Sequence, residues 1–286
     1  MLIIGYGYIG KYIASKYIKK GNKVTAVVTS AEKKSRAYKH KILPICCNLD
    51  KQYLPLNSTK DREIFYFAPP PLIGTKDKRM KNFLSGLMNS GKPKRIVYMS
   101  TTGVYGDCKG KWVDEKQTLN PQADRAKRRV HAESLLKEYK KKIGFELIIL
   151  RVAGIYGPER LPLERLQNRT PIISEQDAPW TNRIHSYDLV NICISAMENG
   201  KDGEVYNVSD GNPGKMTDYF NKIADLTGLP RPPIISKQES EETLSAALLS
   251  YLAESRRLDN KKVLADLKIK LKYPNLRDGL IASLKK

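Results

Sequence analysis

Three glycines near the start of the chain form the pattern G-x-G-x-x-G in the stretch GYGYIG, residues 5–10. A short apolar run at residues 2–4 precedes them, and apolar side chains at helical spacing follow in residues 11–20. In a strand–turn–helix unit, such glycines let the backbone approach a pyrophosphate at the positive end of the helix dipole. The pattern therefore predicts a dinucleotide-binding loop formed by Gly5, Gly7, Tyr8, Ile9 and Gly10.

The next predicted strand ends in the segment VVTSAEKKSR, residues 27–36, where an NAD site often has a carboxylate for the ribose 2′-hydroxyl. A carboxylate would repel a 2′-phosphate, whereas hydroxyls and cations accept it. The segment therefore favours NADP, with NAD as the alternative, and we expect Thr29, Ser30 and Lys33 to contact the cofactor. A solvated helix start is the other interpretation of Lys33, Lys34 and Arg36.

Predicted strands alternate with helices over the first half of the chain. Strands are expected at residues 23–30, 40–48, 63–71, 95–103 and 145–157, and helices at 124–142 and 186–200, the latter capped by Ser186 or Asp188. This rhythm predicts an α/β fold, a Rossmann doubly wound parallel sheet with a smaller C-terminal substrate lobe. We expect the NAD(P)-binding domain at 1–157, to which 183–204 returns, and the smaller substrate-side lobe at 158–286.

The formal net charge of +21 makes a polyanion a partner to consider. However, the lysines occur in short runs along the whole chain, without regularly interleaved aromatic residues and without a zinc-finger or RNP-type signature. This distribution is typical of a solvated basic surface. It argues against nucleic acid as a partner and favours a small-molecule substrate.

Metal and membrane sites are not indicated by the sequence. The four cysteines lack C-x-x-C spacing, and three histidines are too few for most metal sites, so we expect none. No apolar run reaches about 18 residues, and the first residues lack the features of a secretory signal. We therefore expect a cytoplasmic protein without a membrane segment.

Six motifs follow one another in a recognisable order along the chain. They are GYGYIG, APPP at 68–71, STTGVYGD at 100–107, LRVAGIYGP at 150–158, NRIHSYDL at 182–189 and VYNVSDG at 205–211. With this ordered set the chain resembles the extended short-chain dehydrogenase/reductase superfamily, also called the NAD(P)-dependent epimerase/dehydratase family. The segment 256–280 is similar to the tail of a subgroup of small epimerase-like proteins.

The resemblance implies roles for individual residues. Asn48 and Leu49 would contact the adenine, Ala68 and Pro69 the ribose and phosphate, and Val152 would lie near the nicotinamide. Thr101 occupies the position of the family's hydroxyl residue, which bonds the reacting oxygen of the substrate, and Tyr105 follows it four positions later. The resemblance also allows a homodimer.

Two residues of the motif NRIHSYDL are predicted to face the substrate. These are Arg183 and His185. The family's arginine for nucleotide diphosphates lies where this chain has Thr181, so assigning that role to Arg183 assumes a shift of two residues along an extended strand. A buried strand end held by the imidazole is the alternative interpretation of His185.

The chain departs from the family on the helix that follows Tyr105. The family has a tyrosine there and a lysine four positions later, and the lysine turns a phenol with a pKa of about 10 into a usable base. Aligned by RVHAESLL, the chain has Arg125 and Arg129 at these positions. Arg129 can still bind the ribose hydroxyls. A guanidinium does not accept a proton at neutral pH, so Arg125 would instead clamp an anionic group or stabilise an oxyanion. A solvated helix start is the alternative interpretation of Arg125. Since Arg125 cannot be the base, an active enzyme would need Tyr105, Asp107 or Asp124 to relay the proton.

Two functions are favoured by these residues, ahead of a third and weaker one, RNA or DNA binding through the basic surface. The first is an NAD(P)-dependent oxidoreductase or epimerase with an atypical active site, acting on a hydroxyl or carbonyl carbon of a nucleotide sugar or another small anionic substrate. The second is a non-catalytic NADP-binding sensor or partner-binding protein.

Overall fold

The computed structural model describes residues 1–285, which divide into two compact units. Unit 1 consists of Met1–Val104, Asp124–Arg151 and Val190–Tyr206. Unit 2 consists of Tyr105–Ala123, Val152–Leu189 and the described residues from Asn207 onward. The predicted domain boundary at residue 157 stays a prediction.

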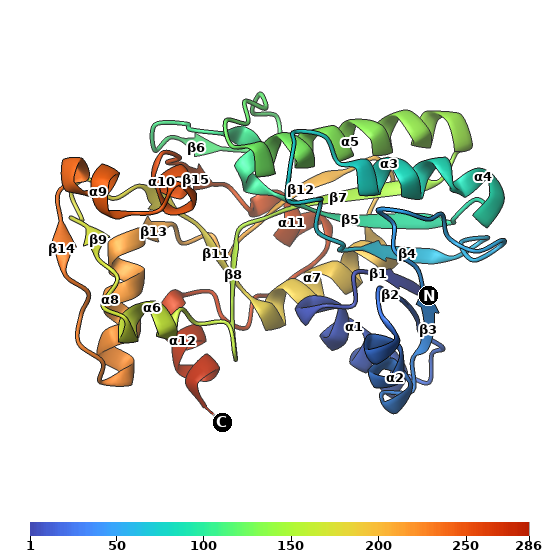
Figure 1. Ribbon diagram of the computed structural model, residues 1–286, viewed down its shortest axis with the longest axis horizontal. Helices are drawn as coiled ribbons and strands as arrows, with labels where there is room; N and C mark the ends of the chain where they lie inside the picture. The colour runs from blue at the N-terminus through green and yellow to red at the C-terminus, as the bar shows by residue number, and fades with distance from the viewer. Residues whose placement is uncertain (286) are drawn as a thin grey trace. The chain divides into compact units, whose positions relative to one another are not determined.

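A seven-stranded sheet in the order β12-β7-β5-β4-β1-β2-β3 forms the centre of unit 1 (Figure 1). The registers of β1 with β2 and β4, of β2 with β3 and of β4 with β5 are all parallel. The order reverses at β1, as it does in a doubly wound sheet. The predicted α/β fold with a parallel sheet is thus confirmed. The strands are β1 (Leu2–Ile4), β2 (Thr25–Val28), β3 (Leu43–Cys46), β4 (Glu63–Tyr66), β5 (Arg95–Thr101), β7 (Glu146–Val152) and β12 (Val205–Val208).

Helices cover both faces of this sheet, with α3 and α5 on one face and α1, α2 and α7 on the other (Figure 1). The inner strands read as apolar runs because both of their faces are buried, as Leu2, Ile3 and Ile4 are. Asp77 caps α3 by accepting a hydrogen bond from the amide of Met80. The helices are α1 (Tyr8–Lys19), α2 (Ala31–Lys39), α3 (Lys78–Ser85), α4 (Leu87–Ser90), α5 (Asp124–Ile143) and α7 (Ser186–Asn199).

One local prediction was wrong. The strand expected at 145–157 is interrupted after β7, because the amide of Gly154 donates to Asn182, and the chain continues as β8, which pairs with β11. The carboxylate of Asp188 accepts hydrogen bonds from the amides of Lys272 and Tyr273, both at 2.9 Å, and the cap of α7 by Ser186 or Asp188 stays a prediction.

Unit 2 is built from short two-stranded ribbons and helices around its own apolar core, which includes Tyr156, Phe220 and Leu280. The glycine Gly228 ends α8 in the left-handed conformation. Its strands are β6 (Trp112–Val113), β8 (Gly154–Tyr156), β9 (Ile172–Ile173), β10 (Trp180–Thr181), β11 (Arg183–His185), β13 (Gly214–Lys215), β14 (Ile234–Ile235) and β15 (Arg257–Leu258). Its helices are α6 (Leu163–Gln167), α8 (Met216–Thr227), α9 (Lys237–Thr243), α10 (Ala246–Leu252), α11 (Lys261–Asp266) and α12 (Leu276–Leu284), and a 3-10 turn spans Thr102–Tyr105.

Candidate functional site

The glycine loop joins β1 to α1, and each glycine has a different reason to lack a side chain. Gly5 has φ +99°, and a Cβ there would lie 2.4 Å from the amide nitrogen of Ala68. A Cβ at Gly10 would lie 2.8 Å from the carbonyl oxygen of Gly5, so this glycine lets α1 pack closely against the loop. Gly7 has φ −99°, and a Cβ there would meet no atom within 4 Å. The backbone at Gly7 is therefore open to a ligand.

Two other residues of the loop pattern, Tyr8 and Ile9, make packing contacts. Ile9 is buried in the core, and the ring of Tyr8 packs edge-on against that of Tyr12 at 5.2 Å.

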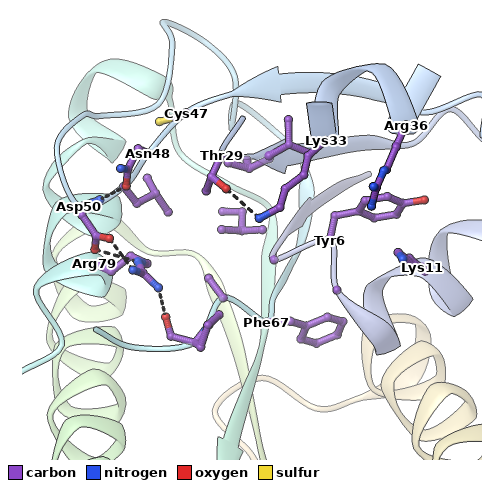
Figure 2. Close-up of a pocket in the computed structure, with 18 residues that line it drawn as sticks. Tyr6, Lys11, Thr29, Lys33, Arg36, Cys47, Asn48, Asp50, Phe67 and Arg79 are labelled. Carbon is purple, nitrogen blue, oxygen red and sulfur yellow. Dashed lines mark hydrogen bonds and ion pairs between the residues drawn. The ribbon is translucent and has the colours of Figure 1, made fainter. Parts of the chain in front are cut away.

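A cavity of about 570 Å³ lies beyond the carboxyl ends of β1, β2, β3 and β4 (Figure 2). Ligands bind at this edge of doubly wound sheets, next to the point where the strand order reverses. The lining contains predicted cofactor residues from four separate segments, namely Gly5, Gly7, Thr29, Lys33, Asn48, Leu49, Ala68 and Pro69. Other predicted residues are not among the lining residues, namely Tyr8, Ile9, Gly10, Ser30, Arg129 and Val152.

Basic side chains line one side of this cavity (Figure 2). The ammonium group of Lys33 donates to the hydroxyl of Thr29 at 3.1 Å. Arg36 and Lys11 also line the cavity, and Arg36 forms an exposed ion pair with Glu32. Exposed pairs of this kind contribute little to stability, so the guanidinium can exchange its partner.

Ser30 has a local role. Its hydroxyl oxygen accepts a hydrogen bond from the amide of Lys33 at 3.3 Å and caps α2.

The opposite side of the cavity holds an ion pair that the sequence did not indicate. Arg79, in the first turn of α3, binds Asp50 through two nitrogens, with Nε at 2.9 Å from Oδ1 and Nη2 at 2.5 Å from Oδ2. It also donates to the carbonyl of Pro69. The pair therefore neutralises the carboxylate of Asp50 and ties together two of the loops that line the cavity (Figure 2).

The two residues predicted to contact adenine lie in the loop after β3. The side-chain oxygen of Asn48 accepts a hydrogen bond from the amide of Asp50 at 3.0 Å. Leu49 is buried, and its carbonyl accepts a hydrogen bond from Asn82 of α3 at 2.8 Å. These contacts hold the loop against α3, so its position does not depend on a ligand.

The arginines of α5 have different surroundings. Arg129 donates through Nη1 to the hydroxyl of Tyr98 at 3.2 Å and to the carbonyl of Met99 at 3.1 Å. Arg128 is buried and donates to the carbonyl of Gly74. Arg125 is half-buried in the first turn of the helix. Arg129, predicted to stand at the family's lysine position, is thus already hydrogen-bonded within unit 1.

Tyr98, which accepts a hydrogen bond from Arg129, is not a usable base at neutral pH. Burial raises its pKa to about 12, although the Arg129 guanidinium acts in the opposite direction. The phenol therefore stays protonated at neutral pH.

Of the two predicted residues around the end of β5, Thr101 lies in unit 1 and Tyr105 in unit 2. Thr101 is the last residue of β5, is half-buried, and its hydroxyl accepts a hydrogen bond from the amide of Gly103 at 3.3 Å. In unit 2, Tyr105 is buried and its hydroxyl donates to the side-chain oxygen of Asn207 at 2.6 Å. The Tyr105 hydroxyl thus has a structural partner, and its catalytic role stays a prediction.

The two predicted substrate residues lie side by side on β11 of unit 2. The guanidinium of Arg183 stacks on the ring of Tyr219 at 3.9 Å, and burial lowers its pKa. His185 is buried, where its Nδ1 accepts from the amide of Tyr187 at 3.1 Å and its ring packs 4.1 Å from that of Tyr273. Burial also lowers the pKa of His185. These contacts give both side chains a packing role, and substrate binding by them stays a prediction.

A buried carboxyl next to Arg183 gives unit 2 a pH-dependent stability. Burial raises the pKa of Asp210 from 3.8 to about 7, although the Asn212 amide and Arg183 oppose the shift. The folded protein therefore binds this proton more tightly than the unfolded chain, and the stabilisation is lost as the pH rises to about 7. From pH 5 to 8, we expect Asp210 to lower the free energy of unfolding by about 3 kcal/mol. In urea unfolding, Asp210→Asn should remove this decrease; an unchanged pH dependence would contradict the assignment.

Comparison with known proteins relates part of the chain to one protein family. Residues 79–209 match the model of the NAD dependent epimerase/dehydratase family. The predicted resemblance to this epimerase/dehydratase family is confirmed. Human dTDP-D-glucose 4,6-dehydratase is 27% identical over 128 residues, which are 42% of this chain and 37% of the dehydratase. The chain thus spans little more than a third of that relative. Protein YeeZ of Escherichia coli K12 is 22% identical over 282 residues, which are 96% of each chain.

Solved structures share the epimerase/dehydratase fold over nearly the whole chain. A functionally unknown conserved protein from Silicibacter pomeroyi has a TM-score of 0.81 and 27% identity, covering 99% of this chain and 96% of its own. UDP-glucuronic acid 4-epimerase from Bacillus cereus, solved with UDP-glucuronic acid and NAD, has a TM-score of 0.77 and 19% identity, with the same coverage. At that identity the epimerase shows the fold alone.

Residues 1–285, which the structure describes, contain neither a membrane-spanning helix nor a cluster of metal ligands. No helix is long and apolar enough to span a membrane. No group of three or more histidine, cysteine or acidic side chains lies close enough together to hold a metal ion.

Proposed function

We propose that the chain binds NADP in the cavity of unit 1. The observation that carries the proposal is the combination, in one cavity, of an open glycine backbone at Gly7 with Thr29, Lys33 and Arg36 at the end of β2. A pyrophosphate fits the first feature and a 2′-phosphate fits the second. Asp50, an acidic residue of the lining, is neutralised by Arg79 and does not oppose a phosphate. The Bacillus cereus epimerase, which has the same fold, was solved with NAD. The preference for NADP over NAD is therefore the more specific part of this proposal.

The adenine and the ribose and phosphate of the cofactor have candidate contacts in the cavity. Asn48 and Leu49 would face the adenine, and Ala68 and Pro69 the ribose and phosphate. When bound, the nicotinamide would supply a site that accepts or donates a hydride. The chain's own residues would orient the cofactor and hold the anionic groups.

We further propose an oxidoreductase or epimerase acting on a hydroxyl or carbonyl carbon of a small anionic substrate. Two of the proteins named above, the human dehydratase and the Bacillus cereus epimerase, act on or bind nucleotide sugars, and this substrate class is the first to test. Thr101 would donate a hydrogen bond to the reacting oxygen. Arg125 would stabilise negative charge on the substrate, because a guanidinium can donate but cannot act as the base.

A non-catalytic NADP-binding protein is the second candidate. It is favoured by the contacts of Arg129 with Tyr98 and Met99, which occupy donors of the side chain at the family's lysine position. The raised pKa of Tyr98 also favours the non-catalytic candidate, because the phenol beside Arg129 is not a usable base.

Thermal unfolding with added cofactor tests the binding proposal. A ligand at about 100 times its dissociation constant raises the free energy of unfolding by about 2.7 kcal/mol, so NADP should raise the Tm by several degrees and by more than NAD does. No shift with either cofactor at millimolar concentration would reject both candidate functions.

Turnover separates the two candidates. With NADPH and a panel of keto sugars and nucleotide sugars, an enzyme should show turnover that Arg125→Ala lowers at least about tenfold, as expected when a group that stabilises transition-state charge is lost. Lys127→Ala, an exposed neighbour on α5, is the matched control and should leave the rate within about twofold. Tight NADP binding without turnover across the panel would favour the non-catalytic candidate.

A further inference from the structure

Unit 2 carries an alternating row of cations and indole rings on two short ribbons. In the ribbon β6–β15, Trp112 is the cross-strand partner of Arg257, whose guanidinium lies 5.5 Å from the indole centre. In the ribbon β10–β13, Trp180 is the partner of Lys215, whose ammonium lies 5.1 Å from the indole. Arg257 also lies 5.2 Å from Trp180 and so joins the two ribbons into the row Lys215–Trp180–Arg257–Trp112.

Backbone contacts fix the row in place. Arg257 donates through Nε to the carbonyl of Gly110 at 2.6 Å, and the amide of Trp180 donates to the hydroxyl of Ser255 at 3.0 Å. Gly110 has φ +70°, and a Cβ there would lie 2.9 Å from the indole of Trp180. The aromatic surface is therefore rigid before any ligand arrives, which lowers the entropic cost of binding.

The outer end of the row opens into a second cavity, of about 560 Å³. Trp112 lines it and is 53% exposed, although large aromatic side chains are usually buried. Lys109 and Lys111 line it too and are exposed. The carboxylate of Asp107 accepts hydrogen bonds from the amides of Lys109 and Ser255, both at 3.0 Å, which partly offsets its charge.

The chemistry of this cavity suits a nucleotide. An exposed indole stacks on a base, lysines bind phosphate, and the amides of Gln117 and Asn120 in the lining can bond base edges. We propose that this cavity binds a nucleotide, with its base on Trp112 and its phosphate at Lys109 and Lys111. The ligand is either a free nucleotide or one unit of a single-stranded nucleic acid. All of these residues belong to unit 2, so the proposal does not depend on the NADP cavity.

Intrinsic fluorescence offers a direct test, because the chain has two tryptophans and both are in the row. The whole chain is titrated with CMP and with an octamer of deoxycytidylate at low salt. Cytosine is chosen because it is not the base of the NADP site. We expect saturable quenching by at least one of the two. Equal affinity per nucleotide would identify a free nucleotide, and an octamer bound at least about tenfold more tightly would identify a single strand.

Variants are compared by the polarisation of a labelled octamer, or by competition with CMP if CMP binds alone. Trp112→Leu should weaken binding at least about tenfold, whereas Trp112→Phe, which keeps an aromatic ring, should stay within about threefold. Lys109→Ala with Lys111→Ala should weaken binding at least about fivefold. The matched control removes two exposed lysines from α5 of unit 1, Lys137→Ala with Lys141→Ala, and should have less than a twofold effect.

Two results would overturn the proposal. One is the absence of saturable quenching by both CMP and the octamer. The other is an equal loss of binding in the α5 control, since that would show attraction by diffuse charge without a site. If Trp112→Leu fails to fold, the lysine pair and Trp112→Phe still decide between these outcomes.

Discussion

Replacement of both Lys33 and Arg36 by alanine is expected to weaken NADP binding about 100-fold and to leave NAD binding within about threefold. Both side chains line the cavity beside Thr29, where a 2′-phosphate would lie. A hydrogen bond to a charged group contributes about 1.5–3 kcal/mol, and two such losses correspond to about two orders of magnitude in the dissociation constant. Isothermal titration calorimetry with each cofactor measures the dissociation constants of the variant and of the unaltered protein, and so the change in affinity for NADP and for NAD.

The stability of the variant should not change, so the effect on affinity can be interpreted. Ser30 caps α2 through the backbone amide of Lys33, which alanine retains, and the Arg36–Glu32 pair is exposed. Lys34→Ala is the matched control, because Lys34 is exposed on the same helix and is not among the lining residues. Equal weakening of NADP and NAD, or an equal effect of Lys34→Ala, would remove the argument for a 2′-phosphate site.

The fold was predictable because its signals are local. The strand, the glycine turn and the helix of residues 2–20 each have a periodicity that is visible in a short window. The same holds for the end of β2, where the absence of a carboxylate can be read directly from the chain. Burial of both faces of the sheet explains why its strands are short apolar runs.

The Arg79–Asp50 pair was not predictable, because 29 residues and two loops separate its members. A guanidinium and a carboxylate at that separation carry no periodic signal. The row of Trp112, Trp180, Lys215 and Arg257 is a similar case. The sequence argued against nucleic acid because aromatic and basic residues do not alternate along the chain, whereas strand pairing makes them alternate in space.

Tyr105 illustrates the limit of a motif. The sequence makes it a candidate proton relay in an active enzyme, but its partner in unit 2 is Asn207, at a separation of 102 residues. A buried hydroxyl needs a hydrogen-bond partner, and the sequence cannot say which residue supplies it.

Gly5→Ala is expected to destabilise the fold, whereas Gly7→Ala is expected to weaken cofactor binding and leave the fold intact. At Gly5 a Cβ would lie 2.4 Å from a backbone atom of Ala68, and the backbone has φ +99°. Left-handed strain of about 1–2 kcal/mol adds to overpacking of about 1–3 kcal/mol, so we expect Gly5→Ala to lower the free energy of unfolding by about 3 kcal/mol. Urea unfolding without cofactor measures this loss.

At Gly7 the same methyl group should leave the fold intact and impair binding. The residue has φ −99°, no atom lies within 4 Å of the position of a Cβ, and Gly7 lines the cavity. The free energy of unfolding should change by less than about 0.5 kcal/mol. The methyl group would occupy the space in which the backbone approaches a pyrophosphate, so the affinity for NADP and NAD should fall by at least about tenfold. A Gly7→Ala protein that binds both cofactors with unchanged affinity would show that the glycine loop does not hold a pyrophosphate, because the variant tests that contact without altering the packing around it.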